Sequence, residues 1–178
     1  MCVLDRQAGA CLRDIAGAIG EAFGVEIHPV LIVADLSAAR EPGRSQLDAA
    51  GVLKIIGDVL PPSEEKVLAV TMEDLYTPVL SFVLGEAELG GRLAVMSLHR
   101  MRDSFYGLPD IPGALLQRAR KESIHEVGHT FGLTHCASRL CPMHPSTCAE
   151  ELDFRSSDLC RSCHRKVFSG RRPAASKE

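Results

Sequence analysis

Residues 125–135, HEVGHTFGLTH, constrain the fold of this chain more than any other feature of the sequence. His125 and His129 are four residues apart, so on an α-helix their side chains lie about 40° apart around the axis, one turn along it. Two imidazoles placed in this way can reach one metal ion. The segment therefore predicts an α-helix that carries two metal ligands.

The third histidine, His135, lies too far along the chain to share the same helical face. Gly132 favours a left-handed turn after the helix, which would bring His135 back to the metal. A catalytic zinc site uses three protein ligands and keeps one position for water. Glu126 follows the first ligand directly and can act on that water without binding the metal. HExxH alone arises by chance, but agreement at all five positions favours metal ligands over ordinary helix histidines.

Composition indicates one compact domain with a substantial core. The chain has 178 residues, 46% of them hydrophobic and 24% charged, as in an ordinary globular protein. A formal net charge of −3 gives no support to nucleic acid or an anionic membrane as a partner. We find neither a secretory signal nor an apolar run of the roughly 20 residues that span a bilayer. We expect a cytoplasmic protein, with a monomer favoured although the sequence does not fix the oligomeric state.

Short apolar runs alternate with amphipathic stretches up to residue 132, and this pattern predicts an α/β domain. Gly90-Gly91 favours a hairpin between the last two of the predicted strands. The expected helices cover residues 12–23, 45–60 and 114–131, and the expected strands cover residues 25–34, 66–71, 81–86 and 93–99. We expect an N-terminal α/β subdomain, 1–132, that includes the active-site helix, and a Cys-rich C-terminal subdomain, 133–178.

Cysteines crowd into the second of these regions. Cys160 and Cys163 form a CxxC pair, and Cys136 and Cys141 form a looser one. Four thiolates can close a tetrahedral structural zinc site, which would order a segment with little apolar periodicity. Three alternatives remain open: haem attachment at Cys160–Cys163–His164, a thioredoxin-like redox pair, and free thiols. Outside the cluster we expect unligated cysteines, namely Cys2, Cys11 and Cys148.

The histidine segment resembles the H-E-x-x-H-x-x-G-x-x-H element of the metzincins. The cysteines, together with Cys141-Pro142-Met143, resemble the archaemetzincin branch, as do Asp74-Leu75-Tyr76 and Phe105-Tyr106-Gly107. The resemblance implies a twisted, mostly parallel five-stranded sheet with one antiparallel edge strand above the cleft and the active-site helix below it. It also implies that Met143 forms a tight turn under the three histidines, and that the four cysteines bind structural zinc.

Several other residues have weaker claims to a role. His28 and His99 are expected to be ordinary edge histidines, and His164 to lie beside the cysteine cluster without binding metal. His144 follows Met143 and is a candidate for contact with substrate or metal, and Tyr106 or His144 could donate to an oxyanion. Asp74 and Tyr76 are expected to cap a loop. The basic group is expected to be solvated and comprises Arg161, Arg165, Lys166, Arg171 and Arg172.

The function expected from these features is zinc-dependent hydrolysis of peptide bonds, with Glu126 as general base. Two zinc ions are expected per chain, one catalytic and one structural. A peptide or protein substrate could add as a strand to the edge formed by residues 81–86 or by their hairpin partner. The alternatives are a metzincin-scaffold zinc-binding protein with little or no peptidase activity, and a thiol redox protein.

Overall fold

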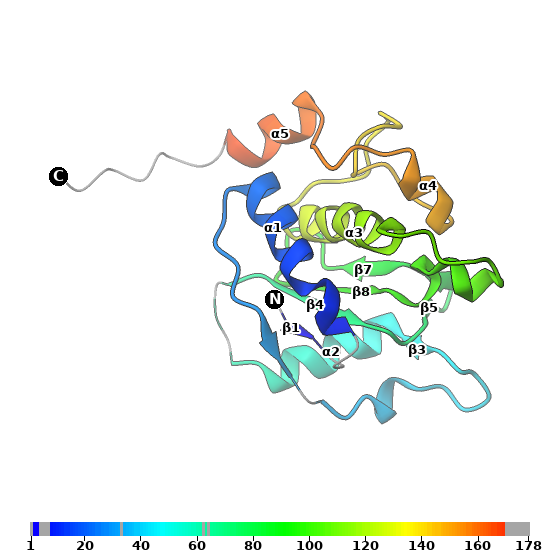
Figure 1. Ribbon diagram of the computed structural model, residues 1–178. Coiled ribbons are helices and arrows are strands. Elements are labelled where there is room, and N and C mark those ends of the chain that lie inside the picture. The colour runs from blue at the N-terminus through cyan, green and yellow to red at the C-terminus, as the bar shows by residue number, and fades with distance from the viewer. Residues whose placement is uncertain (1, 4–7, 33, 62, 64, 170–178) are drawn as a thin grey trace.

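The computed structural model describes all of the chain except residues 1, 4–7, 33, 62, 64 and 170–178. A five-stranded sheet has helices α1 and α3 on one face and helix α2 on the other (Figure 1). The helices are α1 Leu12–Phe23, α2 Ala49–Val59, α3 Ala114–Thr130, α4 Ala149–Asp153 and α5 Arg161–Phe168. Within the described parts of the chain, no helix has both the length and the apolar character of a membrane span.

The main sheet has the strand order β2-β1-β4-β8-β7. The first four strands are parallel, and β7 pairs antiparallel with β8 at the edge. This is the mixed five-stranded sheet that the resemblance implied. Its strands are β1 Cys2–Val3, β2 Val30–Leu31, β4 Val67–Thr71, β7 Gly85–Ala87 and β8 Leu93–Ser97.

A second sheet of three strands was not predicted. It has the order β3-β5-β6, with β3 Leu47–Asp48, β5 Leu75–Thr77 and β6 Leu80–Val83. The single strand predicted over 81–86 was wrong, because the chain leaves the small sheet at Val83 and enters the main sheet at Gly85. Leu84 between them is buried in the core. The change of sheet places β7 over helix α3.

Helix α1 has the predicted bounds. Ile15, Ile19 and Phe23 recur at helical spacing and are fully buried, and Gly24 ends the helix at φ +60°. The strand predicted over 25–34 was wrong for most of its length, because among the described residues of this segment only Val30 and Leu31 pair with β1. Both side chains are about half exposed, so an apolar run here marks a short edge strand and not a buried one.

Helix α2 begins later than predicted. The Asp48 carboxylate accepts a hydrogen bond from the Gly51 backbone N–H at 3.2 Å, which is the contact of an N-cap residue. Residues 47–48 pair with β5 instead of extending the helix. The helix was predicted to begin earlier because apolar residues, Leu47 and Ala49, stand on both sides of the N-cap residue Asp48.

Helix α3 is covered on two sides, by the sheet and by the chain that follows it. Charged side chains are therefore buried in it, among them Arg118 and Lys121. Arg118 pairs with Asp103 and with Asp153 of α4, each at 2.7 Å. Lys121 donates to the Leu152 carbonyl oxygen at 2.8 Å. These bonds attach the C-terminal segment to the helix that carries the histidines.

Candidate active site and metal centres

The three predicted histidines converge. Ligand-type nitrogens of His125, His129 and His135 lie within 4.8 Å of one another. His125 and His129 come from successive turns of α3, and their Nε2 atoms are 3.0 Å apart. The helix ends in a Schellman motif, in which Gly132 has φ +81° and its N–H donates to the His129 carbonyl oxygen at 2.8 Å. This turn carries His135 back to the other two rings.

Backbone carbonyls orient two of the rings. Nδ1 of His125 lies 2.8 Å from the Pro142 oxygen, and Nδ1 of His129 lies 2.7 Å from the Leu133 oxygen. Both Nδ1 atoms therefore carry the proton, which leaves Nε2 of each ring available to a metal. Burial lowers the pKa of His125 to about 3 and also lowers the pKa of His129. The neutral imidazoles and their spacing fit zinc, for which tetrahedral nitrogen ligands lie roughly 3.3 Å apart.

Glu126 lies beside this cluster against the edge strand. Its side chain is 3% exposed, and a Cβ built on Gly85 of β7 would lie 2.5 Å from Glu126 Oε1. Only glycine leaves room for the carboxyl group at that point. Burial, and then the charge and hydrogen bond of Glu122, raise the pKa of Glu126 well above its usual value. A dication nearby would favour the ionised form again.

These groups line one cleft of about 760 Å³ between the edge strand and helix α3. Its upper wall is β6 and β7, its floor is the helix, and residues 145–147 form the far side. The cleft contains the three histidines and Glu126. An extended peptide would therefore meet the histidine cluster and the carboxyl group together.

Met143 lies under the histidine cluster. It is fully buried, and its Sδ would lie 2.3 Å from a Cβ built on Gly128 of α3. Its carbonyl oxygen accepts a hydrogen bond from the Cys136 N–H at 2.8 Å. Met143 therefore packs against helix α3 between His125 and His129.

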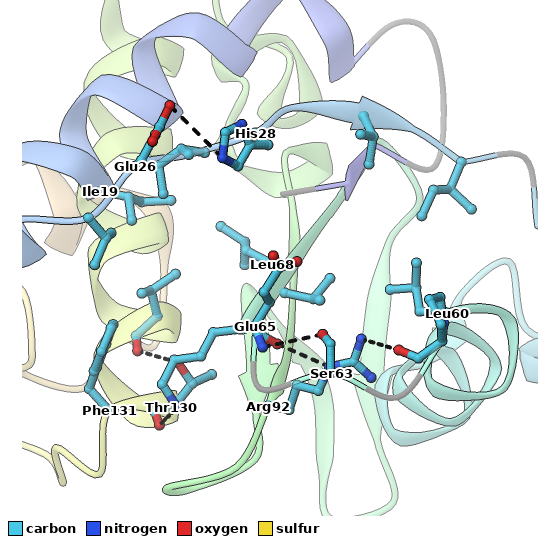
Figure 2. Close-up of a pocket in the computed structure, with 18 residues that line it drawn as sticks. Ile19, Glu26, His28, Leu60, Ser63, Glu65, Leu68, Arg92, Thr130 and Phe131 are labelled. Atoms are coloured by element: carbon cyan, nitrogen blue, oxygen red, sulfur yellow. Dashed lines mark hydrogen bonds and ion pairs between the residues drawn. The ribbon is translucent and has the colours of Figure 1, made fainter.

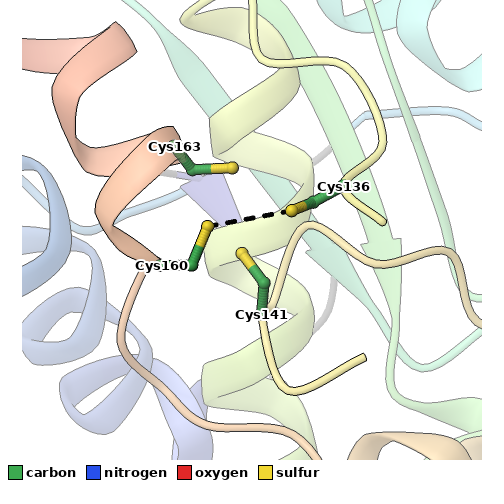
Figure 3. A group of neighbouring side chains, drawn as sticks. All are labelled: Cys136, Cys141, Cys160 and Cys163. Carbon is green, nitrogen blue, oxygen red and sulfur yellow. Dashed lines mark hydrogen bonds between the residues drawn. The ribbon is translucent and has the colours of Figure 1, made fainter. Parts of the chain in front are cut away.

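Four cysteines form a second cluster (Figure 3). The sulfurs of Cys136, Cys141, Cys160 and Cys163 lie within 4.8 Å of one another. Cys136 Sγ and Cys160 Sγ are 3.7 Å apart, close to the edge of about 3.8 Å in a tetrahedral Zn–S₄ site. None of the cysteines that the structure describes forms a disulfide. The spacing and ligand type fit a closed zinc site.

The thiol of Cys160 has a lowered pKa. The residue caps helix α5, where hydrogen bonding to the Cys163 backbone, and secondarily to that of Ser162, lowers its pKa to about 7. A thiolate is the form that binds metal. Cys11 and Cys148 lie outside the cluster, and the side chain of Cys2 is outside the described residues.

Comparison with known proteins decides the family. The sequence model of Peptidase family M54 matches residues 53–169. The archaemetzincin of Methanocaldococcus jannaschii is 40% identical over 157 residues, which are 88% of this chain and 84% of that protein. The chain belongs to peptidase family M54. It is accordingly a zinc metallopeptidase of the archaemetzincin type.

Two solved structures of similar proteins agree with the fold. The crystal structure of archaemetzincin from Methanopyrus kandleri has a TM-score of 0.81 and 32% identity, and the match covers 93% of this chain and 90% of that one. The structure of a zinc-dependent peptidase from Methanocorpusculum labreanum also has a TM-score of 0.81, with 27% identity and coverage of 93% and 97%. The α/β fold predicted for this M54 peptidase is confirmed.

The other histidines of this M54 peptidase lie outside the cluster. His144 Nδ1 is 2.8 Å from the Cys136 oxygen, and His99 Nδ1 is 3.0 Å from the Met72 oxygen. His28 is largely exposed, and the His164 ring lies 4.5 Å from the Phe168 ring, centroid to centroid, at a tilt of 33°. The His144 ring is therefore bonded to the Cys136 backbone, and His144 is not among the residues that line the cleft.

Asp74 and Tyr76 lie away from the cleft. Asp74 accepts two hydrogen bonds of 2.8 Å from the Arg100 guanidinium, and the Tyr76 hydroxyl donates to Glu41 at 2.5 Å. The pair was expected to cap a loop, but Tyr76 lies within β5. Tyr106 is 40% exposed and does not line the cleft. Of the basic group, Arg171 and Arg172 lie outside the described residues.

Three residues near the cleft were not predicted from the sequence, namely Glu122, Arg155 and Gly85. Glu122 is one turn before Glu126 on α3, and a glutamate at that spacing is usually on a solvated helix face. Arg155 follows α4 and is 5% exposed. Gly85 carried a usable signal, since a glycine inside a strand often marks a close approach of another group.

A second pocket of about 580 Å³ lies at the C-terminal ends of α1 and α3 (Figure 2). Apolar side chains form most of its wall, such as those of Ile19, Leu68 and Phe131. Lys66 and Arg92 line this pocket, and both side chains bond to backbone oxygens. Lys66 Nζ donates to the Thr130 oxygen at 2.6 Å, and Arg92 Nη2 donates to the Pro61 oxygen at 2.8 Å. The groups that fit metal-dependent hydrolysis lie in the other cleft.

Proposed function

We propose that this M54 peptidase cleaves peptide bonds with His125, His129 and His135 as the ligands of the catalytic zinc and Glu126 as the general base. The strongest support is the cleft, in which ligand nitrogens of three imidazoles lie close together beside a buried carboxyl group. In two of those rings Nδ1 is bonded to a backbone carbonyl oxygen, which leaves Nε2 available to the metal.

The bound zinc would act as a Lewis acid toward the scissile carbonyl and lower the pKa of water toward neutrality. Glu126 accepts a proton from the attacking water and later delivers it to the leaving amine. Gly85 keeps the edge strand close above that carboxyl group. The substrate pairs with the free edge of β7, so that its backbone lies along the cleft.

The second zinc ion, in this proposal, is structural and is held by Cys136, Cys141, Cys160 and Cys163. Residues 133–178 then form a C-terminal subdomain ordered by metal, beside an N-terminal subdomain of residues 1–132. Four thiolates complete the coordination of zinc and leave no open position for chemistry. Because the chain supplies both pairs from loops and a short helix, metal binding contributes to folding.

The test is hydrolysis of a broad peptide library by the full chain, with and without a zinc-binding hydroxamate. Wild-type protein should cleave peptides, and the hydroxamate should abolish cleavage. Glu126→Gln should retain zinc and lose turnover by roughly 100-fold or more, because general-base catalysis contributes 10²–10⁴-fold. Near-native turnover of this variant would remove Glu126 from its role. A zinc-loaded wild type without any activity would favour a scaffold protein instead.

A further inference from the structure

A short loop, residues 136–144, joins the histidine cluster to the cysteine cluster. It begins with Cys136, directly after His135, and it also contains Cys141. Two of the four clustered sulfurs therefore belong to it (Figure 3). The last part of the loop is buried, with Cys141 1% exposed and Met143 fully buried. Whatever keeps this loop in place affects both clusters.

The loop touches helix α3 at two points that bear on the helix histidines. The Pro142 carbonyl oxygen accepts the bond from His125 Nδ1 at 2.8 Å and so sets the orientation of that ring. Met143 packs on Gly128, which lies between the two helix histidines. Removing a group that orients a metal ligand typically costs 10–100-fold in metal affinity. The position of the loop therefore bears on how tightly the histidine cluster can hold zinc.

His144 closes this loop on itself. Its Nδ1 lies 2.8 Å from the Cys136 carbonyl oxygen, so this nitrogen carries the proton and donates to that oxygen. Its backbone N–H donates to the Cys141 carbonyl oxygen at 3.0 Å. The Cys136 N–H in turn donates to the Met143 oxygen at 2.8 Å. These bonds hold the first residue of the loop against its last two, and one residue bonds to both cysteines of the loop.

We propose that His144 is a positioning residue of the catalytic site. Its ring belongs to neither cluster and does not line the cleft, so it acts through the loop. By fastening the loop, it holds the Pro142 oxygen against His125 and fixes the Cys136 peptide next to His135. The inference rests on the proposed histidine ligands of the catalytic zinc. It predicts that His144 sets the affinity of those ligands for zinc.

Two substitutions at His144, made in the full chain, separate the hydrogen bond from simple packing. His144→Leu removes the donor and keeps a branched side chain, whereas His144→Asn keeps an N–H donor close to the place of Nδ1. Competition with a zinc chelator, followed by metal analysis, measures the Kd of each site. His129→Ala, which lacks a histidine ligand, identifies the ion that belongs to the cysteine site.

His144→Leu should raise the zinc Kd of the histidine site by roughly 10–100-fold and leave the cysteine site filled. His144→Asn should restore the wild-type Kd. At limiting zinc, the peptidase activity of His144→Leu should fall together with its zinc content, and added zinc should recover it. His164→Leu is the matched control, because its exposed ring lies beside Phe168 and outside the loop. This control should bind both ions as wild type does.

A wild-type Kd for the histidine site in His144→Leu would overturn the inference, and so would an equal loss of affinity in His144→Asn. If His144→Leu does not fold, His144→Ala replaces it, because it removes the same donor without adding apolar bulk.

The outcomes also separate this inference from the proposed function. If His129→Ala keeps both zinc ions, the proposed ligand set is wrong and the inference fails with it. If His129→Ala loses one ion while His144→Leu binds both as tightly as wild type, only the inference is overturned. If wild type binds both ions and cleaves no peptide, the proposed activity fails, and the Kd values still decide the role of His144.

Discussion

His135 and Cys136 are consecutive residues, yet the imidazole of one lies in the histidine cluster and the sulfur of the other lies in the cysteine cluster. A single peptide unit therefore joins the two proposed metal sites. The Cys136 N–H donates to the Met143 oxygen, so the turn below the histidines is fixed at the same point. A shift of the cysteine cluster would move the third histidine.

Removing a helix histidine should empty one site only. His129→Ala deletes a ligand on α3, and the neighbouring cysteine cluster keeps its four sulfurs, so we expect one zinc per chain in place of two. Metal analysis of the dialysed protein measures this. Loss of both ions together would contradict independent sites.

Removing a cysteine ligand should lower thermal stability. Structural zinc contributes on the order of 10 kcal/mol as folding energy, and in a chain of this size each kcal/mol changes Tm by about 2–4 °C. We expect Cys160→Ser to lower Tm by roughly 10 °C or more. Scanning calorimetry compares it with Cys148→Ser, whose sulfur is outside the cluster. Equal melting temperatures for the two variants would argue against structural zinc.

Adding one methyl group to the edge strand should impair catalysis. The Cβ of Gly85→Ala would lie 2.5 Å from Glu126 Oε1, so the carboxyl group must move, and we expect kcat to fall by roughly 10–100-fold with two zinc ions retained. Gly17→Ala is the control, because its Cβ would meet no atom within 4 Å. Unchanged kcat in Gly85→Ala would show that Glu126 tolerates displacement.

The packing of Met143 on Gly128 should appear as coupling between two mutations. Gly128→Ala places a Cβ 2.3 Å from Met143 Sδ, and overpacking of this kind costs about 1–3 kcal/mol. Met143→Ala leaves a cavity that costs about 2–5 kcal/mol. The double variant should be more stable than the sum of the two losses implies, because each change relieves the other. Chemical denaturation measures all four proteins, and strict additivity would contradict the contact.

Sequence periodicity predicted the elements that bury one continuous face. Helix α1 has an apolar stripe and a glycine stop, and both its ends were predicted. Strands β4 and β8 are central and buried, so their apolar runs were also found. The short strands β1, β3 and β5 were missed, because two or three residues in a strand do not establish a period of two.

The gathering of the histidines and of the cysteines was predictable because their spacing in the sequence is local. Two histidines one helical turn apart, a glycine and a CxxC pair each occupy a few residues. Glu122 and Arg155 were not predictable, since their partnership depends on how the segment after α3 folds back. A glutamate and an arginine 33 positions apart carry no local sign that they share one buried site.

Cys163 lies in α5 and Cys160 is the N-cap residue of that helix, so this pair follows every other member of the histidine and cysteine clusters in the chain. During synthesis, the histidine helix, the methionine turn and the first cysteine pair leave the ribosome before this second pair does. The cysteine cluster, which is joined to His135 through Cys136, is therefore completed last. A nascent chain would thus gain the ability to cut peptides only after α5 has been synthesised.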